Sequence, residues 1–186
     1  MFQKESTNAV VLDLQPHLKG ELIELRALAP DDWDELFAVA SDSLIWEQHP
    51  ESDRYKEDVF RVFFKDALGS GGAFAIVDRK TRQIIGSTRF YEYDPEKSQI
   101  EIGWTFLARK YWGGRYNREM KDLLLTHAFQ FVENVVFFVG ETNLRSQKAL
   151  EKIGALKVGT ATRAYGNHPP ATNLKYVIRK SEKVES

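Results

Sequence analysis

The sequence predicts an α+β fold: a largely antiparallel set of strands, one strand–helix–strand unit in the middle, and a final pair of strands. Hydrophobic residues recur every three or four positions in some stretches and alternate with polar residues in others, which indicates both helices and strands. Short polar turns separate three consecutive strand-like segments between residues 73 and 107. The 186-residue chain shows no internal repeat and no low-complexity linker, so we expect residues 19–186 to form a single domain.

The N-terminal third of the chain predicts a leader, one strand and two helices. Residues 1–18 show no clear pattern, and we expect them to be loosely ordered. Residues 22–27 alternate as a strand does. A proline followed by two aspartates then marks the start of a helix over residues 33–40. A second helix is expected over residues 55–68, where a glycine-rich stretch ends it.

Three consecutive strands are expected next, over residues 73–77, 83–93 and 99–107, joined by polar turns at 78–82 and 94–97. Side chains of a strand alternate between its two faces. One face of the third strand is therefore predicted to carry Ile100, Ile102, Trp104 and Phe106. The other face is predicted to carry Glu101, Gly103 and Thr105.

The C-terminal part predicts a long helix over residues 116–131 and then a short apolar strand over residues 135–139. A run without polar residues is typical of a central strand that is covered on both faces. Another helix is expected over residues 145–153, with a glycine directly after it. Strands over residues 156–162 and 173–179 complete the predicted fold.

Composition excludes several classes of function. The formal net charge of −1 argues against a general nucleic-acid binder. The chain has no cysteine, which excludes disulfides, thiolate metal sites and a cysteine nucleophile. Its four histidines lie far apart, so we expect no metal site. We find neither an apolar signal segment nor a run of transmembrane length, and we therefore expect a cytoplasmic protein that does not bind membranes.

The most informative stretch is Trp112–Met120, which follows the third predicted strand and opens the long helix. It contains two glycines and two arginines. The first turn of a helix presents unpaired backbone N–H groups, and the helix dipole adds positive potential there. A glycine-rich basic loop at such a position predicts a binding site for phosphate groups.

The order of these elements resembles that of the GNAT superfamily of acyl-CoA-dependent N-acyltransferases, and especially its ribosomal-protein alanine N-acetyltransferase-like branch. Two segments carry the resemblance, 101–119 and Asn143–Ala155. The second segment reads Asn-Leu-Arg-Ser-Gln-Lys-Ala-Leu-Glu-Lys-Ile-Gly-Ala. Together with the matching element order, the likeness covers about residues 20–180. It implies a GNAT fold, with a mixed, mostly antiparallel twisted sheet of about six to seven strands and helices on both faces.

The resemblance also implies a cofactor site for acetyl-CoA, which acts as a co-substrate. Its pyrophosphate would be wrapped by the loop residues Lys110, Trp112, Gly113, Gly114, Arg115, Tyr116 and Asn117. Its pantetheine arm would pair with the backbone of Phe106, Leu107 and Ala108. Asn143 and Ser146 would lie near the pantetheine and the thioester.

Arg115 departs from the family pattern, because it stands where a second small residue normally lets the backbone approach the phosphates. Its side chain could swing outward and add a charge-assisted contact to phosphate. It could instead obstruct the site. The sequence leaves both alternatives open.

Glu101 is the residue that the resemblance implies as the catalytic base, since attack on a thioester requires a neutral amine and a group that takes its proton. The alternative for Glu101 is a carboxylate on an exposed strand face. Ser146 is implied as the donor to the leaving thiolate, because Leu150 occupies the position where relatives carry a tyrosine. The alternative for Ser146 is an N-terminal helix cap. The residues expected to contact the acceptor substrate are His49, Tyr91 and Trp104.

We therefore predict an N-acetyltransferase that moves an acetyl group from acetyl-CoA to a primary amine, either a protein N-terminus or a small molecule, by direct attack in a ternary complex. The alternative function is a degenerate GNAT domain that binds acyl-CoA as a sensor or interaction module without catalysis. The expected partners are acetyl-CoA and an amine acceptor. The sequence is compatible with a monomer or a homodimer.

Overall fold

The computed structural model describes residues 12–164 and 169–183 and contains one mixed sheet. Within these residues the sheet has eight strands in the order β1-β2-β3-β4-β5-β6-β8-β7, and every neighbouring pair is antiparallel except β5 and β6. The strands are β1 (Leu18–Lys19), β2 (Ile23–Ala27), β3 (Ala73–Asp78), β4 (Ile84–Asp94), β5 (Gln99–Leu107), β6 (Asn134–Gly140), β7 (Leu156–Arg163) and β8 (Ala171–Arg179).

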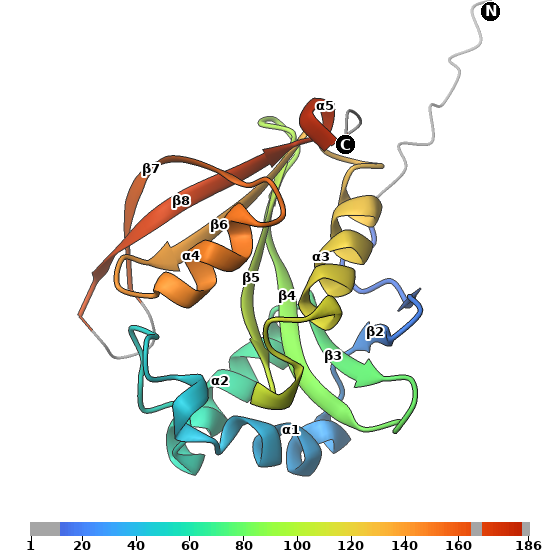
Figure 1. Cartoon of the computed structure of the whole chain (residues 1–186), viewed down its shortest axis with the longest axis vertical. Helices are drawn as coiled ribbons and strands as arrows, with labels where there is room; N and C mark the ends of the chain where they lie inside the picture. Colours follow the sequence, from blue (N-terminus) through green and yellow to red (C-terminus); the bar gives the residue numbers. More distant parts are fainter. Residues whose placement is uncertain (1–11, 165–168, 184–186) are drawn as a thin grey trace, which may run out of the picture.

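Helices cover both faces of the sheet, as predicted (Figure 1). The α-helices are α1 (Trp33–Ala40), α2 (Glu57–Gly69), α3 (Arg115–Ala128), α4 (Leu144–Glu151) and α5 (Lys180–Lys183). One hydrophobic core lies between the sheet and α3 and α4, and a second lies between the sheet and α1 and α2. The second core is rich in stacked and edge-on aromatic rings, which accounts for much of the aromatic content. The predicted α+β class is confirmed, and most element boundaries differ from the prediction by only a few residues.

Part of the predicted leader packs against the domain. Leu12 is buried in the core under α3, and the side chain of Gln15 donates a hydrogen bond of 2.8 Å to the carbonyl of Ala73. The carbonyl of Asp13 lies 2.8 Å from Nε2 of His127 on α3. The end of the leader also begins β1, which is one strand more than the sequence predicted. Residues 1–11 lie outside the described part of the chain.

A β-bulge in β5 overturns the predicted division of its side chains. Gly103 pairs with Arg89 and Phe106 pairs with Ser87, so that two residues of β5 face one residue of β4. Trp104 has a φ of 51°, which is unusual for a non-glycine residue and marks the bulge. The extra residue reverses the alternation. Phe106 therefore joins the core under α1 and α2, whereas Ile100 and Ile102 face α3.

The parallel pair β5 and β6 stays together over three residues only. Gln99–Glu101 pairs with residues 134–136, after which the two strands separate. Beyond that point β5 remains paired with β4 up to Leu107, and β6 remains paired with β8 up to Gly140. The sheet therefore divides into two halves that separate and leave a wedge-shaped space between β5 and β6. Helix α3 lies beside one half and α4 beside the other (Figure 1).

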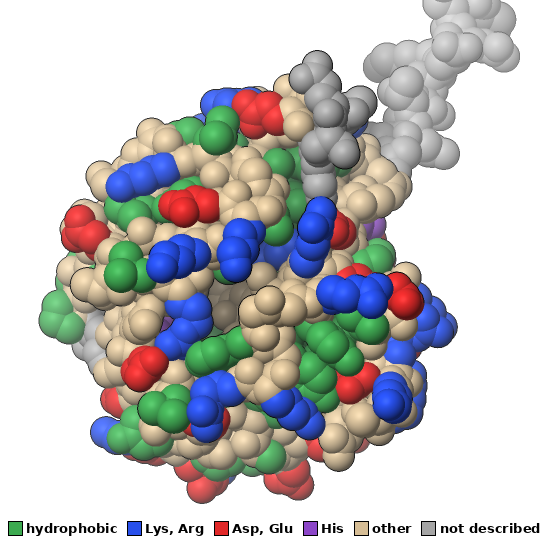
Figure 2. Space-filling model, in the orientation of Figure 1, with side chains coloured by type: hydrophobic (Ala, Val, Ile, Leu, Met, Phe, Trp, Pro, Cys, Tyr) green, Lys and Arg blue, Asp and Glu red, His purple; other side chains and the backbone are tan. Residues whose placement is uncertain are grey.

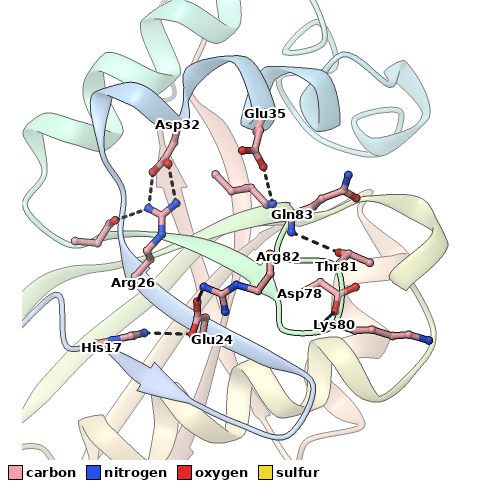
Figure 3. A network of polar contacts seen from close by, with 12 residues as sticks. His17, Glu24, Arg26, Asp32, Glu35, Asp78, Lys80, Thr81, Arg82 and Gln83 are labelled. Atoms are coloured by element: carbon pink, nitrogen blue, oxygen red, sulfur yellow. Dashed lines mark hydrogen bonds and ion pairs between the residues drawn. The ribbon is translucent and has the colours of Figure 1, made fainter.

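A polar network fixes the first helix to the edge of the sheet (Figure 3). Arg26 of β2 forms two hydrogen bonds, of 2.7 and 2.8 Å, with the carboxylate of Asp32 at the start of α1. Glu35 of α1 accepts a hydrogen bond of 3.0 Å from the backbone N–H of Ile84 in β4. Nearby, burial alone would raise the pKa of Glu24, but its contacts with Arg82 and His17 hold that pKa below its ordinary value.

Glu119 fixes α3 against the turn between β1 and β2. Its two carboxylate oxygens accept hydrogen bonds from three consecutive backbone N–H groups, those of Glu21, Leu22 and Ile23, at 2.7 to 2.9 Å. A Cβ atom at Gly20 would lie 2.5 Å from this carboxyl group, so a larger residue there would push the carboxylate away from its three N–H partners. Because Glu119 lies in the second turn of α3, these bonds also fix the position of the N-terminus of α3.

Replacing Glu119 with Gln should lower the free energy of unfolding by about 1–3 kcal/mol, because the amide turns one acceptor into a donor that faces backbone N–H groups. Urea denaturation compared with the wild type and with a control variant, Glu96→Gln in an exposed turn, measures the effect. Equal stability of the two variants would show that Glu119 does not anchor the helix.

Candidate functional site

The wedge between β5 and β6 contains a cavity of about 220 Å³. One wall is formed by β5 from Ile102 to Leu107 and the opposite wall by β6 from Phe137 to Gly140. The N-terminal ends of α3 and α4 both face the cavity, and the connection between α1 and α2 closes it from a third side. The separation of the two strands thus brings two helix N-termini to one place.

The lining of this wedge cavity is free of carboxylates. Its lysine and arginine residues are Arg54, Lys121 and Arg145, and none of the described residues that line it is Asp or Glu. The space-filling view shows a hollow at the centre of this face with Lys and Arg side chains gathered around it (Figure 2). Arg54 pairs with Glu51 and Arg145 with Glu47, so the absence of carboxylates from the described lining, more than an excess of cations, makes the cavity suitable for an anionic ligand.

The N-terminus of α3 has the features of a phosphate-binding loop. Gly113 has a φ of 69°, a conformation that glycine adopts without strain, and Gly114 is the N-cap residue. No side chain accepts a hydrogen bond at this cap, so the first turn of α3 lacks a side-chain cap. Trp112 holds the loop against the sheet, because its indole Nε1 donates a bond of 2.8 Å to the carbonyl of Leu107.

The predicted cofactor residues divide into two groups. The group that lines the wedge cavity consists of Phe106, Leu107, Trp112, Gly113, Asn117, Asn143 and Ser146. The group that lies outside its lining consists of Ala108, Lys110, Gly114, Arg115 and Tyr116. The backbone N–H of Ala108 already donates to the carbonyl of Ile85, so it takes part in the sheet. The ladder between β5 and β6 ends at Glu101, so among the described residues β5 has no strand partner on its β6 side from Ile102 onward.

Arg115, the departure from the family pattern, points away from the wedge cavity. Its guanidinium lies 2.7 Å from a carboxylate oxygen of Glu21, in the turn between β1 and β2, and the side chain is 72% exposed. In this conformation it leaves the cavity unobstructed.

Asn143 caps the N-terminus of α4. Its Oδ1 accepts a hydrogen bond of 3.1 Å from the backbone N–H of Ser146. The alternative interpretation of Ser146 as the cap residue is therefore wrong: Ser146 lies in the first turn, and it lines the wedge cavity. Leu150, one turn further along α4, also lines the cavity and offers no hydroxyl group.

Lys121 is a site residue that the sequence reasoning missed. It is 5% exposed and lines the wedge cavity from α3. Its Nζ donates a hydrogen bond of 3.1 Å to Oγ1 of Thr105 and lies 5.1 Å from the ring centre of Phe137. Burial lowers the pKa of Lys121 to about 7, so the amine can carry or release a proton near neutral pH. Its spacing of three, four and seven residues from Leu124, Leu125 and Ala128 is the sequence signal that would have placed it on the buried side of α3.

Glu101 is buried and paired. It is 3% exposed, and Nη1 of Arg163 on β7 lies 2.7 Å from its carboxylate. Burial raises the pKa of Glu101, while the charge of Arg163 opposes that rise. The alternative of an exposed strand carboxylate is therefore wrong. Glu101 lies at the last pair of the β5–β6 ladder, directly before the wedge opens.

A second cavity, of about 670 Å³, lies on the α2 side of β4 and β5. Trp104 and Arg54 line both cavities, so the two adjoin at the bulge. Tyr91 lines the second cavity, and its ring is 4.9 Å from that of Trp104. His49, the third residue predicted to contact the acceptor, lines the wedge cavity instead, and its Nδ1 accepts a bond of 3.0 Å from the backbone of Glu51.

The second cavity carries the carboxylates that the wedge lacks. Five acidic residues line it, namely Glu51, Asp53, Asp58, Asp66 and Glu92. Three arginines line it as well, namely Arg54, Arg89 and Arg163. The site thus consists of a basic cavity and a mixed, mainly acidic one that meet at one strained tryptophan.

Comparisons with known proteins agree with this geometry. A model of the acetyltransferase (GNAT) domain matches residues 23–156. The chain is similar to the uncharacterized N-acetyltransferase YnaD of Bacillus subtilis (strain 168), with 25% identity over 145 residues that cover 77% of this chain and 84% of that protein. A crystal structure described as an acetyltransferase from T. thermophilus has 28% identity and a TM-score of 0.76, covering 91% of this chain and 92% of that chain.

The fold is also that of Mycobacterium smegmatis RimJ, whose structure is a complex with CoA-disulfide. The TM-score is 0.68 at 15% identity, over 86% of this chain and 83% of that chain. Among the residues that the structure describes, no helix is long and apolar enough to span a membrane. No cluster of three or more His, Asp or Glu residues with the arrangement of a metal site occurs there either.

Replacing Lys121 with Met should stabilise the protein, and the gain should depend on pH. Below about pH 7 Lys121 is charged in both the folded and the unfolded state, so its burial costs most there. Between pH 7 and the ordinary lysine pKa of 10.5, folding releases a proton, and wild-type stability rises with pH. The advantage of the variant should therefore shrink by about 1.4 kcal/mol for each pH unit.

Urea denaturation of both proteins at several pH values between 6 and 10 measures this difference. Lys148→Met, at an exposed position of α4, is the matched control and should show no such trend. A stability difference for Lys121→Met that is the same at every pH would contradict the lowered pKa.

Proposed function

Because the chain belongs to the GNAT family of acetyltransferases, we propose that it transfers an acetyl group from acetyl-CoA to a primary amine, by direct attack in a ternary complex. The family uses acyl-CoA. The observation that carries the proposal is the carboxylate-free wedge between β5 and β6, with the uncapped N-terminus of α3 at its mouth. The complex of RimJ with CoA-disulfide, a protein of the same fold, supports it.

Each part of the wedge suits a part of acetyl-CoA. The pyrophosphate would accept hydrogen bonds from backbone N–H groups at Gly113–Asn117, where the helix dipole favours negative charge. The pantetheine arm carries amides, and it would lie along the edge of β5 that β6 leaves unpaired beyond Glu101. Its thioester would then reach the bulge at Trp104, where the two cavities meet.

Acetyl transfer forms a bond between the amine nitrogen and the carbonyl carbon, and the carbon–sulfur bond breaks. The attacking amine must lose a proton, and Glu101 is the proposed base, because its raised pKa makes it a stronger base than an ordinary carboxylate. Backbone N–H groups of β5 beyond Ile102 would polarise the carbonyl. Ser146 and Lys121 face the same cavity and would donate to the departing sulfur, where Leu150 supplies no hydroxyl.

The acceptor would enter through the second cavity. Its acidic residues attract a protonated amine, and Tyr91 and Trp104 give it aromatic walls. Arg163 connects this cavity with the base, because it lines the cavity and pairs with Glu101. His49 would contact the acceptor from the wedge side.

A binding module without catalysis is the second candidate function. Two observations favour it: the ion pair between Glu101 and Arg163, which engages the proposed base, and the absence of a tyrosine at position 150. Both leave the wedge intact, so such a protein would still bind acyl-CoA.

Substitutions at the ion pair distinguish the two functions. Glu101→Gln should lower kcat for acetylation of amines by about 10²–10⁴-fold. Arg163→Met keeps the carboxylate but removes the charge that lowers its pKa, so the pKa of Glu101 should rise further. A base works only when deprotonated, and activity is lost as the pH falls through its pKa. The acid limb of the kcat profile should therefore move to higher pH in Arg163→Met.

Steady-state kinetics with acetyl-CoA and a broad panel of amines, from pH 5 to 10, test this. The control Glu133→Gln replaces an exposed glutamate, and its kcat profile should match that of the wild type. Saturable binding of acetyl-CoA without turnover of any amine would contradict the enzyme and support the binding module. An unchanged profile in Glu101→Gln would remove Glu101 from the mechanism.

A further inference from the structure

Arg89 of β4 is a buried cation without a hydrogen-bond partner for two of its donors. The residue is 3% exposed, and its Nε and Nη2 atoms are buried with no acceptor among the described residues. Burying an unpaired charge is costly, and buried arginines are normally paired with carboxylates. Two unsatisfied donors at this buried position therefore destabilise the fold.

Aromatic rings lie against this guanidinium, and the carboxylates of Asp66 and Glu101 act on its charge without hydrogen bonding to Nε or Nη2. Its Cζ lies 4.6 Å from the ring centre of Trp104 and 5.8 Å from that of Phe63. Burial lowers the pKa of Arg89 to about 10, which still leaves it charged at neutral pH. The other two arginines of the second cavity are paired, Arg54 with Glu51 and Arg163 with Glu101.

The two donors without partners form one edge of the planar guanidinium. Nε–H and the adjacent Nη2–H point in parallel, and this pair binds both oxygens of a carboxylate. Arg89 lines the second cavity, which also contains the acidic residues that attract an amine. Nε and Nη2 have almost no accessible surface in this structure, so a carboxylate in the cavity would reach them by shifting the rings of Trp104 or Phe63 that lie against the guanidinium. The cavity thus combines unsatisfied donors for an anion with carboxylates for a cation. It opens onto the wedge at Trp104, where the acetyl group would arrive.

We propose that the second cavity binds an amine that also carries a carboxylate, that is, a free amino acid or a close relative, and that Arg89 holds the carboxylate. The inference rests on the proposed function and adds the class of acceptor to it. A protein N-terminus lacks a carboxylate beside its amine, and it would leave the Nε and Nη2 donors of Arg89 unpaired. A simple amine or polyamine would do the same.

The test compares each of the twenty amino acids with its amide, which removes the negative charge and preserves shape. Acetyl transfer gives the ratio of kcat/KM for the two forms, and calorimetry without acetyl-CoA gives their binding. For at least one amino acid, the acid should be preferred over its amide by about 100-fold or more, because a site built to bind a polar group rejects the analogue that lacks it.

Two substitutions assign that preference to Arg89. In Arg89→Met the ratio of acid to amide should fall to about one, and the melting temperature should stay equal or rise because an unpaired buried charge is gone. Arg89→Lys keeps the charge but lacks the two parallel N–H donors. Its ratio of kcat/KM for the acid to that for the amide should fall about tenfold or more. Arg61→Met, at an exposed position of α2, is the matched control and should keep the wild-type ratio.

The outcomes separate this inference from the proposed function. If amines are acetylated but amides or peptides serve as well as acids, the inference fails and the proposed function stands. If an amino acid binds in a manner that depends on Arg89 but is not acetylated, the carboxylate site stands and the proposed function fails. A preference for acids that survives in Arg89→Met, or the absence of any amino-acid binding and transfer, would also overturn the inference.

Discussion

The separation of β5 from β6 is the constraint on which the rest of the structure depends. The two strands pair over three residues and then diverge, each held by its other neighbour, β4 or β8. The bulge at Trp104 bends β5 at this point and reverses which of its side chains face each core. A residue with φ of 51° costs about 1–3 kcal/mol, and such strain is retained where a surrounding fold enforces it.

The elements on either side of the wedge are fixed by polar groups rather than by apolar packing alone. Glu119 holds α3 to the turn before β2, and Asn143 caps α4, so that the N-termini of both helices face one cavity. The bulge also separates charge. A basic cavity without carboxylates lies on one side of Trp104, and a cavity lined mainly by acids lies on the other.

The sequence predicted the helices, most strands and the family, because hydrophobic period, turn residues and two motifs are local signals. It failed where distant residues decide the outcome. Nothing local to Trp104 indicates a bulge, and the position of Phe106 was therefore wrong. Glu101 is buried beside a partner on another strand, Arg163, which no local pattern reveals. Lys121 and Arg89 are charged residues in buried positions, and reasoning that assigns charged residues to the surface misses both, although the helical spacing of Lys121 marks the buried side of α3.

Hydrogen–deuterium exchange with and without acetyl-CoA tests most directly the claim that the wedge binds the co-substrate. Backbone amides of residues 103–107 on β5 and 113–118 at the start of α3 should exchange more slowly at saturating acetyl-CoA, because the ligand occupies them. The β2–β3 edge should not change, since it lies on the far side of β4. Saturable binding without slower exchange in either segment would contradict the account, and so would protection confined to other parts of the sheet.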